Sequence, residues 1–434
     1  MKSKITSIVR QQLPIASVLL FALATTSIAQ EKLASTNRGS WKQFRGNNTN
    51  GLALGAKLPT TWTESENVIW YTPISGRGWS SPVVDGNEVW LTTATTDGKE
   101  MSAVCLDLNT GKVLHDLLLF KNEKVQPDHH ITNSYASPTP IIEGAFVYVT
   151  FGAYGTACLE RSSGKVLWER RDLECNHYRG AGSSPILYRD LLIFHMDGFD
   201  YQYAVALNKK SGETVWLKNR DIDYGSTNGD LFKAFSTPIV ISVAGQAQLI
   251  SPASKACVAL DPNTGKEIWR VRYQEHSTTV RPLYDGKRIY LSTGFGKAKM
   301  MCVRVDGKDD VTDTHVDWVQ PKSIGSKPSP ILVNELLFDV TDNGVLERLS
   351  VETGEIVWKK RLQGKFSASL VANSSHFYVF NHEGSGWVFT LEEEPKLIAE
   401  NKLPNGCNAS PAIVGNALIV RTLDGIYRIE QKPE

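Results

Sequence analysis

The stretch Asp261-Pro-Asn-Thr-Gly265-Lys-Glu-Ile-Trp269 combines a tight turn with the start of a strand. An aspartate side chain at the first position can hold its own backbone in an Asx-turn, and the glycine allows a positive φ. Apolar residues then resume the alternation of a strand, and the tryptophan brings a large apolar surface that can pack between neighbouring units. The stretch therefore predicts two strands joined by a turn, with an aromatic contact to a neighbour.

This pattern recurs along the chain together with a second one, in which a small hydroxyl residue and a proline precede an apolar run. The turn pattern returns in whole or in part near Gly111, Gly164, Gly212, Trp318 and Gly354. The second pattern has eight copies, marked by Pro82, Pro138, Pro185, Pro238, Pro282, Pro330, Leu370 and Pro411. Neighbouring copies are about 40 to 56 residues apart, which is a period of repeat proteins.

The repeat predicts an all-β fold, an eight-bladed β-propeller of four-stranded antiparallel blades. No helical period separates the two patterns, and one small sheet cannot bury both of its faces unless copies pack around an axis. Residues 67–71 resemble the outer, tryptophan-bearing strand of a blade whose inner strands are missing before it. The last copy, residues 407–430, has inner strands but lacks the outer one. We therefore expect an N-terminal strand to close the propeller.

The N-terminus predicts export. Lys2, Lys4 and Arg10 precede a mostly apolar stretch over residues 13–24, and Ser27-Ile-Ala29 is typical of a signal-peptidase site. The expected organisation is a signal peptide over 1–29, a leader over 30–66, the propeller over 67–430 and a tail over 431–434. An uncleaved anchor is the alternative. The mature chain, beginning at Gln30, is expected in the periplasm, cell envelope or medium without a membrane span.

Charge and cysteines exclude several classes of function. The chain has 47 Lys and Arg residues against 46 Asp and Glu residues. It therefore lacks the excess of basic residues that is typical of nucleic-acid-binding proteins. The six cysteines contain no C-x-x-C motif, which argues against a zinc ribbon or a thioredoxin-type site. Their apolar, repeat-matched positions predict small buried side chains.

These repeats resemble the pyrroloquinoline-quinone-like (PQQ-like) β-propeller family. The opening Trp41-Lys-Gln-Phe44-Arg45-Gly46 also resembles the leader of its exported bacterial members. The family includes quinoprotein dehydrogenases and non-catalytic scaffolds, among them the BamB-like lipoprotein of the outer-membrane β-barrel assembly machinery. No lipid-acceptor cysteine lies near the expected cleavage site, which departs from that lipoprotein.

The resemblance gives expectations about cofactors as well. The dehydrogenases carry adjacent cysteines, calcium ligands and a catalytic aspartate, and this chain has no Cys-Cys pair. We therefore carry over no catalytic residue and expect no cofactor. PQQ with calcium remains an alternative, for which Asp197 and Asp200 are the candidate ligand and base.

Two sets of repeat-equivalent positions are expected at the mouth of the central channel, where loops precede the innermost strands. The position before each proline or its equivalent is occupied by Ser81, Ser137, Ser184, Thr237, Arg281, Ser329, Ser369 and Ser410. Arg281 alone brings a charge, which predicts an anion-binding arginine or a salt bridge in a degenerate repeat. Three residues before the prolines lie Trp79, Tyr135, Gly182, Phe235, Thr279, Lys327 and Asn408. Aromatic residues with Lys327 and Arg281 suit a planar or anionic ligand, unless they only fill the channel.

Longer polar inserts precede blades 2 to 4, and long loops in a compact repeat are typical of functional sites. The candidate ligand-binding residues in and near them are His130, Asn133, His177, Arg179, Asp197, Asp200 and Lys233, in addition to Arg281 and Lys327. A metal is not predicted, because the adjacent side chains of His129 and His130 point in opposite directions on an extended chain.

We expect a non-catalytic exported scaffold that binds a protein or another envelope component through loops of one face. A PQQ-dependent oxidoreductase is the first alternative, and carbohydrate or small-anion binding is the second.

Overall fold

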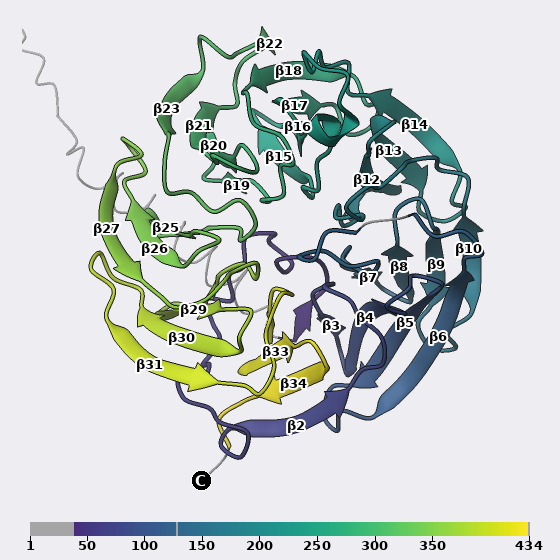
Figure 1. The fold of residues 1–434 in the computed structure, drawn as a ribbon, viewed down its shortest axis with the longest axis vertical. Coiled ribbons are helices and arrows are strands. Elements are labelled where there is room, and N and C mark those ends of the chain that lie inside the picture. Colours follow the sequence, from purple (N-terminus) through teal and green to yellow (C-terminus); the bar gives the residue numbers. More distant parts are fainter. Residues whose placement is uncertain (1–38, 127–128, 433–434) are drawn as a thin grey trace, which may run out of the picture.

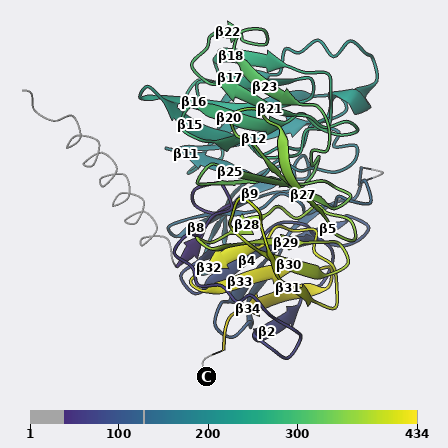
Figure 2. The ribbon, with the colours of Figure 1, turned by 90° about the vertical axis from the view of Figure 1, so that its left-hand side faces the viewer.

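The computed structural model describes residues 39–126 and 129–432, and over this part of the chain eight small sheets surround a central axis. Figure 1 looks down that axis, with the chain passing from blade to blade around the ring. Figure 2 shows the same disc from its edge. The predicted eight-bladed all-β propeller is confirmed. The expected signal peptide over residues 1–29 lies outside the described residues.

Blades 1 to 4 follow one another along the chain, each running from its inner to its outer strand. Blade 1 holds β3 (Val83–Asp85), β4 (Glu88–Ala94), β5 (Glu100–Asp107) and β6 (Val113–Lys121), with β1 (Ser40–Trp41) added at its inner edge. Blade 2 holds β7 (Ile141–Glu143), β8 (Phe146–Thr150), β9 (Thr156–Glu160) and β10 (Val166–Arg170). Blade 3 holds β11 (Ile186–Tyr188), β12 (Leu191–Asp197), β13 (Gln202–Asn208) and β14 (Thr214–Asn219). Blade 4 holds β15 (Ile239–Val243), β16 (Gln246–Pro252), β17 (Ala256–Leu260) and β18 (Glu267–Arg272), with β22 (Asp309–Asp310) parallel to its outer strand.

Blades 5 to 8 repeat the arrangement with shorter connections. Blade 5 holds β19 (Leu283–Tyr284), β20 (Arg288–Ser292), β21 (Met300–Arg304) and β23 (Val316–Gln320). Blade 6 holds β24 (Ile331–Val333), β25 (Leu336–Val340), β26 (Val345–Leu349) and β27 (Ile356–Arg361). Blade 7 holds β28 (Val371–Ala372), β29 (His376–Phe380), β30 (Ser385–Thr390) and β31 (Leu397–Lys402). Blade 8 holds β32 (Ala412–Val414), β33 (Ala417–Arg421), β34 (Gly425–Ile429) and β2 (Val68–Pro73).

The ring is closed by pairing the two ends of the propeller sequence. Strand β2, from the N-terminal side, runs antiparallel to β34, with Val68 opposite Ile429 and Pro73 opposite Gly425. Figure 1 shows β2 beside β34 at the bottom of the ring. The predicted closing strand is therefore confirmed, and it satisfies an edge that would otherwise be open.

The tryptophan of the repeat joins neighbouring blades, as its sequence position predicts. In the closing strand, Trp70 Nε1 donates a hydrogen bond of 2.8 Å to the Leu108 carbonyl in the turn of blade 1. A Cβ added at Gly111 of that turn would lie 2.7 Å from the Trp70 ring, so glycine supplies space as well as its φ of 72°. The same contact between a tryptophan and the turn of the next blade recurs at Trp168, Trp216 and Trp318.

Most of the core lies within and between the blades. All six cysteines are buried thiols, in agreement with their predicted role as small apolar side chains. Over the described ranges, no helix has the length and apolar character needed to cross a membrane. A short 3-10 helix, η1 (Gly229–Phe232), lies in the connection before blade 4.

Candidate functional site

The repeat positions at the channel mouth differ from the predicted ones in blade 2. Innermost strands begin two residues after the repeat hydroxyl, as at Ser81 and Val83, and β7 begins at Ile141. The equivalent residue is therefore Thr139, and the assignment of Ser137 was wrong. The sequence Ser137-Pro-Thr-Pro140 contains the pattern twice, so local sequence alone could not distinguish them. The shift also makes Ser137, and not Tyr135, the residue of blade 2 that is equivalent to Trp79 of blade 1.

The corrected positions form a ring of hydrogen bonds around the channel. A backbone N–H of one blade donates to the hydroxyl of the next, as Thr139 donates to Ser184 Oγ at 2.9 Å. The other bonds of this kind run from Ser81 to Thr139, Ser184 to Thr237, Arg281 to Ser329, Ser329 to Ser369, and Ser369 to Ser410. The hydroxyl residues recur because they satisfy buried backbone donors between blades.

Arg281 replaces a hydroxyl in this ring and does not reach the mouth. Its side chain is buried, and its guanidinium donates to the backbone carbonyls of Phe44 and Pro238. Burial lowers the pKa of Arg281 to about 9, which leaves it charged at neutral pH. The residue predicted to bind an anion directly therefore holds the leader inside the channel.

The leader crosses the channel and closes it beneath the mouth. Strand β1 pairs with the inner strand of blade 1, and Ala53 donates to the Ala372 carbonyl in blade 7. Between them, the buried guanidinium of Arg45 donates to the carbonyls of Ser329, Leu370, Pro330 and Asn50 at 2.6 to 3.3 Å. We call residues 41–46 the channel plug. Sequence reasoning noted this segment only as a family signature, because no repeat pattern marks its position.

Above the plug lies a cavity of about 330 Å³, which we call the mouth. Phe44 of the plug and the side chains of Trp79, Phe235 and Phe295 give it apolar surfaces. Its polar lining includes the predicted His130, Asn133, Arg179 and Lys327, together with Asp230 and the hydroxyl ring. The structure therefore brings four of the nine predicted ligand-binding residues into one cavity.

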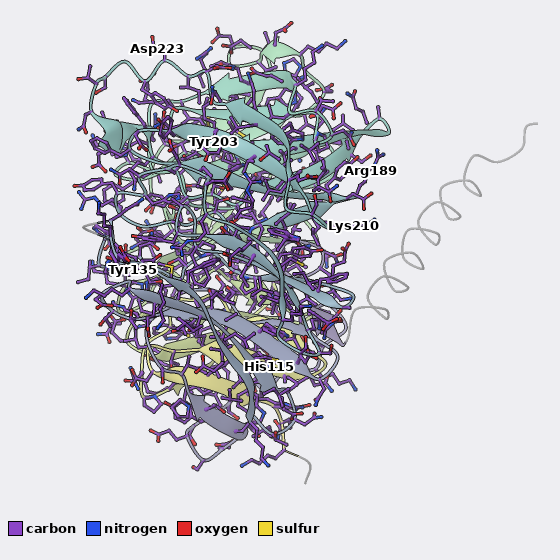
Figure 3. All side chains as sticks on the ribbon, turned by 90° about the vertical axis from the view of Figure 1, so that its right-hand side faces the viewer. His115, Tyr135, Arg189, Tyr203, Lys210 and Asp223 are labelled. Carbon is purple, nitrogen blue, oxygen red and sulfur yellow. The ribbon has the colours of Figure 1, made fainter. Side chains whose placement is uncertain are left out.

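Three long connections border the mouth on one side, namely residues 129–140, 171–185 and 220–238, and we call them the insert surface. They contact one another, since His130 N and Asn133 Nδ2 both donate to the Arg179 carbonyl. Arg179 has a φ of 85°, and its guanidinium lies 4.5 Å from the Tyr178 ring centroid. In Figure 3, Tyr135 and Asp223 of this surface lie toward one face of the disc, and Arg189 and Lys210 lie toward the other.

Four further predicted residues lie outside the mouth lining: His177 and Lys233 belong to the insert surface, Asp197 ends β12, and Asp200 lies between β12 and β13. Asp197 is buried in a two-pronged ion pair with Arg220, at 2.7 and 2.6 Å. Asp200 accepts the N–H groups of Asn176 and Tyr201 and so supports a turn. These contacts give both aspartates structural partners.

His177 and Lys233 are buried close together behind the mouth. Burial, together with the charge of Lys233, lowers the pKa of His177 to about 3. The Lys233 ammonium lies 4.4 Å from the ring centroid of Phe235, which lines the mouth, and has no hydrogen-bond partner among the described residues. Burial lowers the pKa of Lys233 to about 7.

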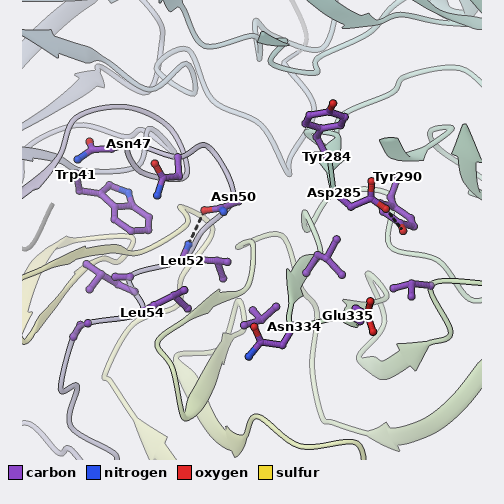
Figure 4. A pocket seen from close by; sticks show the side chains of 18 of the residues that line it. Trp41, Asn47, Asn50, Leu52, Leu54, Tyr284, Asp285, Tyr290, Asn334 and Glu335 are labelled. Carbon is purple, nitrogen blue, oxygen red and sulfur yellow. Dashed lines mark hydrogen bonds between the residues drawn. The ribbon is translucent and has the colours of Figure 1, made fainter. Parts of the chain in front are cut away.

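The opposite face has a larger cavity of about 950 Å³, shown in Figure 4. The leader forms one side with Trp41, Asn50 and Leu54, and turns of blades 5 and 6 form the other. Two basic residues line it, Lys287 and Arg288, and Arg288 is already paired with Asp285 at 3.0 Å and with Glu352 at 3.0 Å. The plug separates this cavity from the mouth.

Comparison with known proteins identifies the family. The sequence model of a family described as outer membrane protein assembly factor BamB matches residues 55–174, 200–346 and 342–431. The chain belongs to the BamB family. The predicted PQQ-like, BamB-like relationship is thereby confirmed.

Two curated BamB proteins give the extent of the sequence similarity. The chain is 21% identical over 316 residues to outer membrane protein assembly factor BamB of Shewanella oneidensis, covering 67% of this chain and 73% of that protein. It is 30% identical over 118 residues to BamB of Burkholderia pseudomallei, covering 26% of this chain and 30% of that one.

Solved structures share the fold of this BamB family member. BamB from Moraxella catarrhalis has a TM-score of 0.52 at 17% identity, over 70% of this chain and 81% of that one. Quinohemoprotein alcohol dehydrogenase from Comamonas testosteroni has a TM-score of 0.66 at 11% identity, and the match covers 93% of this chain and 83% of that one. At such identities the similarity shows the fold alone. An enzymatic function therefore needs support from the residues of the candidate site.

The residues of this BamB family member do not fit PQQ with calcium. Asp230 is the single carboxylate residue in the mouth lining, whereas calcium takes six to eight oxygen ligands. Over the described ranges, no group of three or more His, Cys, Asp or Glu side chains is arranged to hold a metal ion. Asp197, the alternative candidate ligand, is occupied by Arg220.

Proposed function

We propose that this BamB family member is an exported, non-catalytic scaffold whose insert surface binds a protein partner during outer membrane protein assembly. The family description and the names of the curated relatives support the process. The main observation in favour of this binding site is that three long connections lie together beside the mouth on one face. Loops held by a rigid scaffold are where propellers carry binding residues.

The insert surface and the loops beside it have apolar groups suited to a protein contact. Ile131 lies between two mouth-lining residues and is 77% exposed. Phe295, in the mouth lining, is 55% exposed, and Phe199 packs against Tyr178 and is 39% exposed. Exposed aromatic and aliphatic anchors surrounded by polar groups are typical of interface centres.

Photo-crosslinking tests this proposal. A photoreactive amino acid at position 131 should crosslink a component of the outer membrane protein assembly machinery in intact cells. The same group at Lys210, an exposed residue toward the opposite face, is the matched control. Crosslinking of the same component with equal yield from both positions, or of no such component from position 131, would contradict the proposal.

Export is tested separately. We expect N-terminal sequencing of the mature protein to begin at Gln30 and fractionation to find it in the periplasm or attached to the envelope. A protein that retains residues 1–29 and remains in the cytoplasmic fraction would refute this part.

A dehydrogenase is the weaker candidate, since the solved quinoproteins share only the fold and the mouth lacks their ligand set. No observation at the mouth favours electron transfer.

A further inference from the structure

Three buried arginines surround the base of the mouth without a carboxylate partner. Arg45 and Arg281 donate to backbone carbonyls of the plug and of blades 4, 6 and 7. Arg421 lies directly behind the Trp79–Ser81 wall, where it donates to the carbonyls of Ser80 and Thr92 and to the Ser80 hydroxyl. Each is at most 3% exposed. Among the described residues, none of their guanidinium nitrogens lies within 4.0 Å of a carboxylate oxygen.

The charges at the rim do not offset these arginines. Arg179 lies 3.7 Å from Asp230, and Lys327 lies 3.4 Å from Asp342. Both separations exceed the 2.7–2.9 Å of a charge-assisted hydrogen bond. The two carboxylates balance at most the two rim cations, so the buried guanidinium groups remain uncompensated. A concave site with low-dielectric walls concentrates such a field on its opening.

The Lys327 ammonium retains hydrogen-bonding capacity. The Asp342 carboxylate accepts hydrogen bonds from Ser326 N at 2.9 Å, Ser326 Oγ at 2.5 Å and Lys327 N at 3.1 Å. Asp342 thus holds the turn that presents Lys327 and is shared among several donors. A lysine ammonium carries three donors, which leaves Lys327 able to bind another anion.

Two buried side chains of the mouth lining also have unused polar groups. Ser81 is 1% exposed and its hydroxyl has no hydrogen-bond partner among the described residues, although its equivalents in other blades accept one. The indole N–H of Trp79 likewise has none there. Buried polar groups without a partner are uncommon in proteins, so the blade 1 side of the mouth lining keeps unused hydrogen-bonding capacity.

The walls next to Lys327 are aromatic. Phe235 precedes blade 4, Phe295 belongs to blade 5, and Lys327 precedes blade 6, so the three lie in one sector of the mouth. An inorganic oxyanion would satisfy the charge but leave these rings without a contact. A ligand with an apolar, flat part beside its negative group would use both.

We propose that the mouth binds an organic carboxylate with an aromatic body, its carboxylate at Lys327 and its ring against Phe295 and Phe235. The ligand is either a free aromatic acid or the C-terminus of a chain that ends in an aromatic residue. Phe235 also belongs to the insert surface, but the proposal does not require the protein partner proposed there, because it is tested with purified protein and small ligands.

Calorimetric titration of the full mature protein tests the site. Phenylacetate is the probe, and phenylacetamide is its neutral analogue of the same shape. We expect phenylacetamide to bind at least tenfold more weakly, and inorganic phosphate to compete poorly. No heat of binding for phenylacetate, equal affinity for the amide, or equally effective competition by phosphate would overturn the proposal.

Variants locate the site. Lys327→Met should weaken phenylacetate binding at least tenfold, and Phe295→Ala, at an exposed position that tolerates truncation, at least threefold. Lys287→Met removes the same charge from an exposed turn beside the opposite cavity and should leave the affinity unchanged. Equal effects of Lys327→Met and Lys287→Met would refute the assignment.

Peptides separate the two sources of the carboxylate. A hexapeptide ending in phenylalanine, with a free C-terminus, is compared with its C-terminal amide. Binding of phenylacetate together with the free-acid peptide supports a chain terminus as ligand, and binding of phenylacetate alone supports a free aromatic acid. Equal binding of the two peptides would contradict recognition of the carboxylate.

Discussion

Replacing Lys233 by methionine should stabilise the protein in a pH-dependent way. The side chain is 1% exposed, the rings of Phe235 and Tyr178 lie 4.4 and 5.7 Å from its ammonium, and the ammonium has no hydrogen-bond partner among the described residues. Burial disfavours the charged form and lowers the pKa of Lys233 from 10.5 to about 7. Methionine fills a similar volume and has no charge to desolvate.

The size and sign of the effect follow from proton linkage. At pH 7 the unfolded chain keeps Lys233 protonated, whereas the folded protein holds about half a proton there, so folding releases protons and stability rises with pH. A tenfold change in a protonation equilibrium is worth about 1.4 kcal/mol. The cost of burying Lys233 is then about 4 kcal/mol at pH 7 and about 2 kcal/mol at pH 9.

Urea unfolding of the wild type, Lys233→Met and Lys287→Met at pH 7, 8 and 9 measures this cost. Lys233→Met should exceed the wild type in unfolding free energy by about 4 kcal/mol at pH 7, and the gap should narrow by about 2 kcal/mol at pH 9. Lys287→Met, on an exposed turn, should stay within about 0.5 kcal/mol of the wild type. A gap that does not change with pH would refute the reasoning, because the ammonium would then be hydrated or paired.

Three further outcomes are expected. Trp70→Ala should lower the unfolding free energy by about 3–5 kcal/mol, because it removes the closing contact with blade 1, and a loss below about 1 kcal/mol would contradict that role. Asp197→Asn should cost about 3–5 kcal/mol by leaving the buried Arg220 charge uncompensated, and a neutral effect in urea unfolding would contradict the pairing. Addition of PQQ with calcium should produce no alcohol oxidation, and a gain of that activity would support the dehydrogenase instead.

The closing strand could be predicted from sequence because its pattern is local. No inner strands precede the strand of Trp70, and no outer strand follows the last repeat. Both features can be recognised from the order of the residues. The hydrogen bond from Trp70 to Leu108 then repeats a contact that other blades make within continuous sequence. Where a contact recurs in several repeats, as this one does at Trp70, Trp168, Trp216 and Trp318, the sequence period is enough to predict it.

The mouth was predicted less completely, for two physical reasons. In blade 2 the hydroxyl-proline pattern occurs twice within four residues, and only strand pairing at Ile141 selects Thr139. At Arg281 the repeat predicts where the backbone lies, but a long side chain reaches groups that the repeat does not contain. Its partner, the Phe44 carbonyl, lies 237 residues away in the leader.

The net charge of the chain also could not predict the electrostatics of the mouth. The sequence has nearly equal numbers of basic and acidic residues, which by itself predicts no attraction for anions. Yet Arg45, Arg281 and Arg421 converge on one channel with carbonyl partners, while many acidic side chains lie elsewhere in ion pairs of their own, as Glu352 does with Arg288. An electrostatic field depends on where charges lie and on what surrounds them, not on their sum. The plug that carries Arg45 into the channel therefore both closes the channel and gives the mouth above it a positive base.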